Sequence, residues 1–142
     1  MKIADILKNK GASVATVAPT ATVAELLAIL SERNVGAVVV TGPLAVLGIV
    51  SERDVVRRLH DRGAAVLKLS VSEIMTAKVL VCSPEDTVDR LAHTMTERRI
   101  RHVPVVEDGR LAGIVSIGDV VKSRIEQLED DREYLQAYIQ QG

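Results

Sequence analysis

The sequence predicts an α+β fold in which two β-α-β-β-α repeats pack sheet against sheet about a pseudo-two-fold axis, followed by a C-terminal helical extension. The first observation is an internal repeat, because residues 16–56 align without a gap with residues 81–121. The second is a strand-to-helix corner that occurs once in each repeat. The third is composition: the chain lacks Phe and Trp, so its core must consist of Val, Leu, Ile and Ala, and one repeat alone is too small to bury both faces of a sheet.

The repeat divides the 142 residues into a first repeat at 1–62, a second repeat at 63–122 and the extension at 123–142. Roughly a third of the aligned positions are identical, against the few per cent expected of unrelated stretches. The identical pairs include Pro19 and Pro84, Thr22 and Thr87, Val23 and Val88, and Leu26 and Leu91. A second match pairs residues 3–7 with 71–75, so each repeat is expected to begin with a short amphipathic helix.

Each repeat continues with a brief strand, a helix, two strands and a closing helix. Thr22 is the expected N-cap of the first long helix, with Glu25 at the third helical position as in a capping box. The paired strands are expected at 38–40 and 46–50, and again at 103–106 and 111–115. Between the last two, Glu107-Asp108-Gly109-Arg110 has the composition of a hairpin turn.

The corner reads GIVSERD at Gly48–Asp54 and GIVSIGD at Gly113–Asp119. In both copies an apolar run ends at a serine, and an aspartate three residues later opens a helix. Ser-x-x-Asp is close to a capping box, so helix capping alone explains the pattern. The corner also sets free backbone N–H groups beside a hydroxyl and a carboxylate, which suits a phosphorylated, hydroxyl-bearing ligand. Both interpretations remain open at this point.

The segment from Asp119 to Ile139 predicts a helix longer than a closing helix needs to be. Apolar residues recur along it at spacings of three, four or seven: Val121, Ile125, Leu128, Leu135 and Ile139. Arg132 interrupts this stripe. A solvated tail and a dimer contact both fit the pattern.

Overall charge gives no reason to expect a nucleic-acid partner, because 18 Lys and Arg stand against 19 Asp and Glu, with a formal net charge of −1. Tyr134 and Tyr138 lie outside the body of the chain, so base-stacking platforms are missing there. No apolar run approaches the roughly 20 residues of a membrane-spanning helix, and the first residues do not resemble a secretory signal. We therefore expect a cytoplasmic protein with no membrane partner.

The sequence contains no recognisable catalytic or metal-binding set. Cys82 lies in an apolar run without a nearby histidine, and we expect a small buried hydrophobic residue. His60 and His93 sit singly in expected helices, and we expect both at the surface. A nucleophile with an adjacent base, a pair of carboxylates in different environments and a Gly-rich phosphate loop are also missing. We therefore expect neither an enzyme nor a required cofactor.

Taken together, these motifs resemble a known family. The tandem Pro-x-x-Thr-Val and Gly-Ile-Val-Ser-x-x-Asp pattern, with Arg101-His102-Val103-Pro104-Val105-Val106 before the second corner, resembles a pair of CBS domains. This cystathionine β-synthase repeat forms the regulatory pair often called a Bateman module. The resemblance covers Lys2 to about Lys122. It implies clefts that bind adenosine-containing ligands (AMP, ADP, ATP, sometimes NAD(H) or S-adenosylmethionine), a homodimer, and a regulated protein that is unknown.

The resemblance also implies roles for particular residues. Asp54 and Asp119 would hold ribose hydroxyls, and Ser51 and Ser116 the neighbouring oxygens. Ala37-Val38 or His102-Val103 would bracket the adenine. The mouth of the clefts would be lined by Thr16, Val17, Val81 and Cys82.

The two clefts are not expected to be equivalent. Gly36-Ala37-Val38-Val39 in the first repeat stands where Arg101-His102-Val103-Pro104 stands in the second. Arg53 supplies a cation within the first corner, whereas the second would borrow Arg101, His102 or Lys78. We therefore prefer the first corner as the nucleotide site. A scaffold with vestigial clefts, acting through its C-terminal helix, is the alternative.

Overall fold

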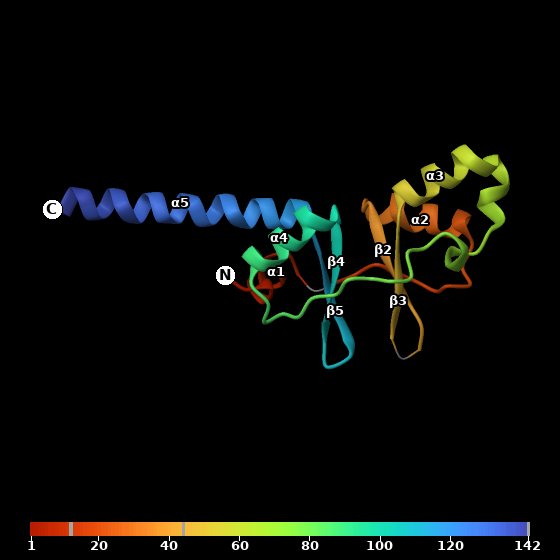
Figure 1. Ribbon diagram of the computed structural model, residues 1–142, viewed down its shortest axis with the longest axis horizontal. Coiled ribbons are helices and arrows are strands. Elements are labelled where there is room, and N and C mark those ends of the chain that lie inside the picture. Colours follow the sequence, from red (N-terminus) through yellow and green to blue (C-terminus); the bar gives the residue numbers. More distant parts are fainter. Residues whose placement is uncertain (12, 44, 142) are drawn as a thin grey trace.

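The computed structural model describes residues 1–11, 13–43 and 45–141, and its chain forms two halves that lie side by side (Figure 1). The first half contains a sheet in the order β1-β2-β3, made of Thr16–Val17, Ala37–Thr41 and Val46–Ser51. The second half contains the pair β4-β5, made of His102–Glu107 and Arg110–Ser116. The two sheets face each other across the middle of the molecule, with helices on both outer sides. This arrangement confirms the predicted fold class.

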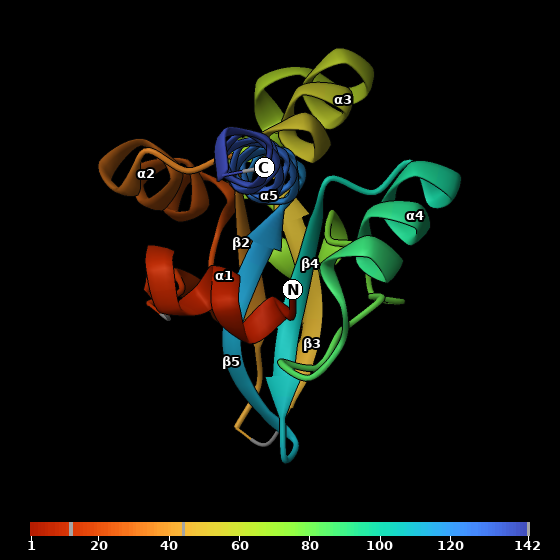
Figure 2. The same ribbon diagram turned by 90° about the vertical axis from the view of Figure 1, so that its left-hand side faces the viewer.

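The helices cover the outer faces of these sheets (Figure 2). In the first half they are α2 (Val23–Arg33) and α3 (Glu52–Arg62), followed by the 3₁₀ helices η1 (Gly63–Lys68) and η2 (Val71–Glu73). In the second half they are α4 (Val88–Arg98) and the start of α5 (Ile117–Gln141), together with the N-terminal α1 (Ile3–Lys10). The outer part of α5 extends well beyond the body, as predicted, and Gly142 lies outside the described residues. No helix in the described ranges is long and apolar enough to cross a membrane.

Local sequence explains where the elements begin and turn. The Thr22 hydroxyl accepts from the Glu25 amide at 3.1 Å, and the Glu25 carboxylate accepts from the Thr22 amide at 3.3 Å, so the predicted capping box is confirmed. Asp108 and Gly109 both have positive φ, 51° and 77°, as the tight turn between β4 and β5 requires. All four paired strands contain the residues predicted for them.

The repeat extends to the register of the strands. Val17 pairs with Val40 in a parallel ladder, and Cys82 pairs with Val105 at the equivalent place. In the second half, however, the brief strand is reduced to this single bridge. Only the Cys82 amide and carbonyl bond to β4, through Pro104 and Val106, and Val81 is 45% exposed.

The hydrophobic cores cross the sequence division at residues 62 and 63. Val66, Val71 and Ile74 pack in the first core, although the alignment places them in the second repeat. Conversely, Ile3 and Ile6 of α1 pack in the second core. Backbone hydrogen bonds fix both exchanges, from Ser72 to Pro19 and from Ala4 to Pro84. Each core is therefore closed by a segment from the other part of the chain.

Candidate functional site

The first corner lies between β3 and α3 and is a capping box. The Ser51 amide donates to Asp54 Oδ2 at 2.8 Å, and the Asp54 amide donates to Ser51 Oγ at 3.3 Å. The Ser51 hydroxyl also donates to the same Oδ2 at 3.1 Å. Within the described residues, Asp54 Oδ1 makes no hydrogen bond. The capping interpretation is therefore confirmed, and one carboxylate oxygen is still available to a ligand.

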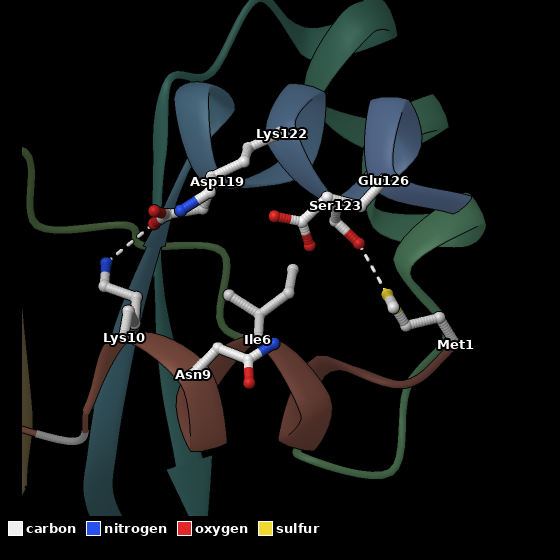
Figure 3. Close-up of a pocket in the computed structure, with 8 residues that line it drawn as sticks. All are labelled: Met1, Ile6, Asn9, Lys10, Asp119, Lys122, Ser123 and Glu126. Atoms are coloured by element: carbon white, nitrogen blue, oxygen red, sulfur yellow. Dashed lines mark hydrogen bonds and ion pairs between the residues drawn. The ribbon is translucent and has the colours of Figure 1, made fainter. Parts of the chain in front are cut away.

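The second corner, between β5 and α5, repeats this geometry. The Ser116 amide donates to Asp119 Oδ2 at 2.9 Å, and the Asp119 amide donates to Ser116 Oγ at 3.1 Å. In addition, Lys10 Nζ reaches in from α1 and donates to Asp119 Oδ2 at 2.6 Å and to the Ile114 carbonyl at 2.9 Å (Figure 3). The Asp119 carboxylate is thus already paired with a cation of the same chain.

The ionisation of Asp119 reflects this pairing. Burial favours its neutral form, but the hydrogen bonds from Lys10 and Ser116 outweigh burial and lower the pKa of Asp119 below its ordinary 3.8. The small cavity beside the pair, about 80 Å³, is lined mainly by α1 and α5 (Figure 3). It lies between these two helices on the outer side of the second half.

A larger cleft, of about 310 Å³, opens in front of the first corner. Six of the predicted site residues line it: Ala37, Ser51, Arg53, Asp54, Arg101 and His102. The sequence assigned Arg101 and His102 to the second corner. They do adjoin it, because His102 pairs with Ser116 and the Arg101 carbonyl accepts from the Ile117 amide at 2.8 Å, but they also line the cleft at the first corner. Seven further residues line the cleft that the sequence did not assign to either corner: Gly36, Ile49, Glu52, Arg57, Thr76, Arg99 and Ile100.

Four arginines converge on this cleft, against two carboxylates from Glu52 and Asp54, so its lining carries a net charge of +2. Arg53 and Arg57 are one helical turn apart on α3, a spacing that places both on one face. Arg99 is the C-cap of α4 and itself adopts the left-handed conformation, with φ of 55°. Asn34 occupies the equivalent place after α2, with φ of 52°. The backbone there is less strained than at Arg99, because asparagine adopts this conformation more readily than arginine.

His102 lies between the two corners. Burial, together with the nearby Lys10 ammonium, lowers the pKa of His102 below 6.5, and Asp119 and Glu52 only partly oppose this. The side chain is therefore neutral at pH 7. It can offer a hydrogen bond to a ligand without adding charge to the cleft.

The model of the CBS domain family matches residues 3–61 and 71–126. The chain belongs to the CBS domain family. The CBS domain-containing protein CBSX3 of Arabidopsis thaliana, described as mitochondrial, is 37% identical over 99% of this chain and 72% of its own. The CBS-domain containing protein ATU1752 from Agrobacterium tumefaciens is 49% identical, with a TM-score of 0.84 over 87% of this chain and 99% of its own.

A third similar structure shows a ligand-bound CBS pair. It is the CBS domain pair of protein MJ0100 in complex with 5′-methylthioadenosine and S-adenosyl-L-methionine. It is 26% identical to this chain, with a TM-score of 0.79 over 89% of this chain and 98% of its own. The chain is thus a pair of CBS domains, a regulatory type of module, and one similar pair binds adenosine derivatives.

Other predicted site residues of this CBS pair lie outside the lining of the cleft. The side chains of Val17, Val38 and Val103 are buried in the two cores, and Pro104 is buried with its carbonyl bonded to Cys82. Thr16 and Val81 are exposed. Their roles stay predictions.

The remaining polar residues fit structural roles. Cys82 is 7% exposed, and burial, with a smaller effect of Asp86, raises the pKa of its thiol to about 12. His60 and His93 are exposed, as predicted. Among the residues that the structure describes, no group of three or more His, Cys, Asp or Glu side chains is placed to hold a metal.

Proposed function

We propose that this CBS pair binds an adenosine-containing nucleotide, of the AMP, ADP or ATP class, in the cleft at the first corner. The observation that carries the proposal is the gathering of Asp54, the N-terminus of α3 and four arginines around one cavity. The free oxygen of Asp54 suits ribose hydroxyls, since bonds to a carboxylate are stronger than neutral ones. The adenine would lie against Ala37 and Ile49.

The charge of the cleft favours a phosphorylated ligand over the other adenosine derivatives. Guanidinium groups bind phosphate through paired hydrogen bonds, and the N-terminus of α3 adds a positive end of a helix dipole. S-adenosylmethionine carries a sulfonium cation and methylthioadenosine carries no phosphate. We therefore expect both to bind more weakly here than AMP, ADP or ATP, with NAD(H) as the phosphorylated alternative.

The second corner is proposed to be the weaker or unused site, because Lys10 already pairs with Asp119 and the cavity beside that pair is only about 80 Å³. Binding at the first cleft would act by population shift. A ligand that contacts both α3 and the start of β4 favours the relative orientation of the halves that completes those contacts. A regulated protein, whose identity is unknown, would read that orientation.

Calorimetric titration with AMP, ADP, ATP, NADH and S-adenosylmethionine tests the proposal, using Asp54→Asn with Asp119→Asn as its matched control. We expect Asp54→Asn to weaken nucleotide binding at least tenfold, which is about 1.4 kcal/mol, and Asp119→Asn to leave it nearly unchanged. The reverse pattern would place the ligand at the second corner. Failure of all five compounds to bind more tightly than about 1 mM would refute nucleotide sensing.

A further inference from the structure

The outer part of α5 carries an apolar stripe that nothing in the described chain covers. The large side chains of the stripe are 50–73% exposed: Val121, Ile125, Leu128, Leu135 and Ile139. In contrast, Val120 and Ser123 face the second half and are almost fully buried. The stripe therefore lies on a different side of α5 from the face that holds the helix to its own body. It spans about 27 Å of helix.

The spacing of the stripe is a regular heptad, in which successive members alternate between steps of four and three residues. With Ile125 at position a, position d holds Val121, Leu128 and Leu135, and position a recurs at Arg132 and Ile139. An a/d seam of this kind is the face that one helix presents to another in a two-stranded coiled coil. A helix that lay alone in water would not need this regularity.

We propose that α5 pairs with α5 of a second copy of this chain as a parallel two-stranded coiled coil through this stripe. The charged flanks argue for this occupant and this direction. In a parallel pair, Arg124 at position g lies opposite Glu129 at position e of the second copy, and the pair occurs twice. In an antiparallel pair that aligns all six a and d positions of the stripe, Glu129 would lie beside Glu129 of the second copy, and Asp131 would lie beside Asp131 of the second copy. Like charges at such positions are unfavourable.

The polar residue in the seam fits the same direction. Arg132 would form a layer with its copy, with the carboxylate of Asp131 at position g of each neighbouring helix beside it. A single charged a position lowers the stability of a coiled coil while fixing its register. Arg124 already contacts Asp89 on α4 through one nitrogen, and a guanidinium has further donors for Glu129. Arg124 can therefore keep its contact with Asp89 while it pairs with Glu129 of the second copy.

The oligomeric state tests the interface with matched variants of the full chain. Leu128→Glu places a charge in the seam, whereas Ala137→Glu places the same charge on the opposite, exposed side of α5. By sedimentation equilibrium, we expect the wild type and Ala137→Glu to dimerise, and Leu128→Glu to dissociate at least tenfold more readily. Circular dichroism checks that both variants keep the wild-type fold. A monomeric wild type across the concentration range, or a Leu128→Glu variant that dimerises like the wild type, would overturn the proposal.

Crosslinking tests the direction. In a Cys82→Ala background, Ile139→Cys places two thiols in one layer of a parallel pair, so mild oxidation is expected to yield a covalent dimer. In an antiparallel pair, residue 139 would instead face residue 121. A mixture of Val121→Cys and Ile139→Cys chains that links only across the two variants would therefore contradict the parallel arrangement.

Discussion

Gly48, the first residue of the first corner, is where a single added methyl group should do most harm. A Cβ built there would lie 2.6 Å from the Thr76 carbonyl oxygen and 2.9 Å from Met75 Sδ. The Thr76 carbonyl cannot easily move away, because it accepts from the Ile49 amide at 3.0 Å while the Thr76 amide donates back to Ile49 at 2.9 Å. Gly48→Ala must therefore separate β3 from the segment that crosses over from the other repeat.

The expected cost follows from these contacts. Overpacking of this kind costs roughly 1–3 kcal/mol, and weakening one of the two hydrogen bonds adds about 1 kcal/mol. Replacing glycine by alanine regains roughly 0.4–1 kcal/mol through the unfolded chain. The free energy of unfolding should thus fall by about 1–3.5 kcal/mol, and Tm by roughly 3–4 °C for each kcal/mol.

Gly113→Ala is the matched control at the equivalent position. Its Cβ would lie 2.6 Å from Leu7 Cδ2, the far end of a flexible side chain that can rotate aside. We expect a loss below about 1 kcal/mol. Urea and thermal denaturation followed by circular dichroism measure both variants. Equal losses for the two, or an unchanged stability for Gly48→Ala, would show that the crossing at Thr76 is not rigid.

Three further predictions concern the charged residues around the two corners. Arg99→Asn should raise the free energy of unfolding by about 0.5 kcal/mol, since asparagine adopts positive φ more readily than arginine. In a titration, the same change should weaken the binding of ATP more than the binding of adenosine. A gain in ATP affinity would show that Arg99 does not contact the phosphates. Lys10→Met should raise the pKa of Asp119. In the wild type the lowered pKa of Asp119 adds stability above 3.8 that is lost as pH falls through the folded value, so the variant should lose less stability than the wild type over this acidic range. Urea midpoints measure both profiles, and identical profiles would argue against the ion pair. Burial and the Lys10 ammonium favour the neutral form of His102, so the wild type should lose stability as pH falls from 6.5 through the lowered pKa of this side chain. His102→Gln should flatten this part of the pH–stability profile. An NMR titration that gives the His102 imidazole a pKa of 6.5 or more would contradict this prediction.

Much of the fold can be predicted from local sequence patterns. Thr22 with Glu25 marks a helix start, Asp108-Gly109 marks a turn, and the alternation of valine-rich runs with glycine marks the strands. These signals act over a few residues, so a single sequence is enough to interpret them. The repeat then supplies the pairing of distant parts, because two similar halves with exposed sheet faces bury them against each other.

Other features depend on contacts between distant residues and leave no local mark. Nothing near Lys10 indicates that its ammonium reaches Asp119, and nothing near Arg101 indicates that it lines the cleft of the other repeat. The same holds for the exchange of α1 and η2. The i and i+4 spacing of Arg53 and Arg57 is a local signal that would have extended the predicted site.

The exchange of segments between the cores also determines how this molecule comes apart. A chain cut between residues 62 and 63 would yield two fragments that each lack part of their hydrophobic core. The first fragment would lack Val66, Val71 and Ile74, and the second would lack Ile3 and Ile6. The halves should therefore unfold as one cooperative unit, although each has its own sheet. Many of these contacts join residues far apart in sequence, which favours slow folding. Sliding the two sheets past each other would strain both chain segments that cross between the halves. We therefore expect motion between the halves to be limited to small rotations.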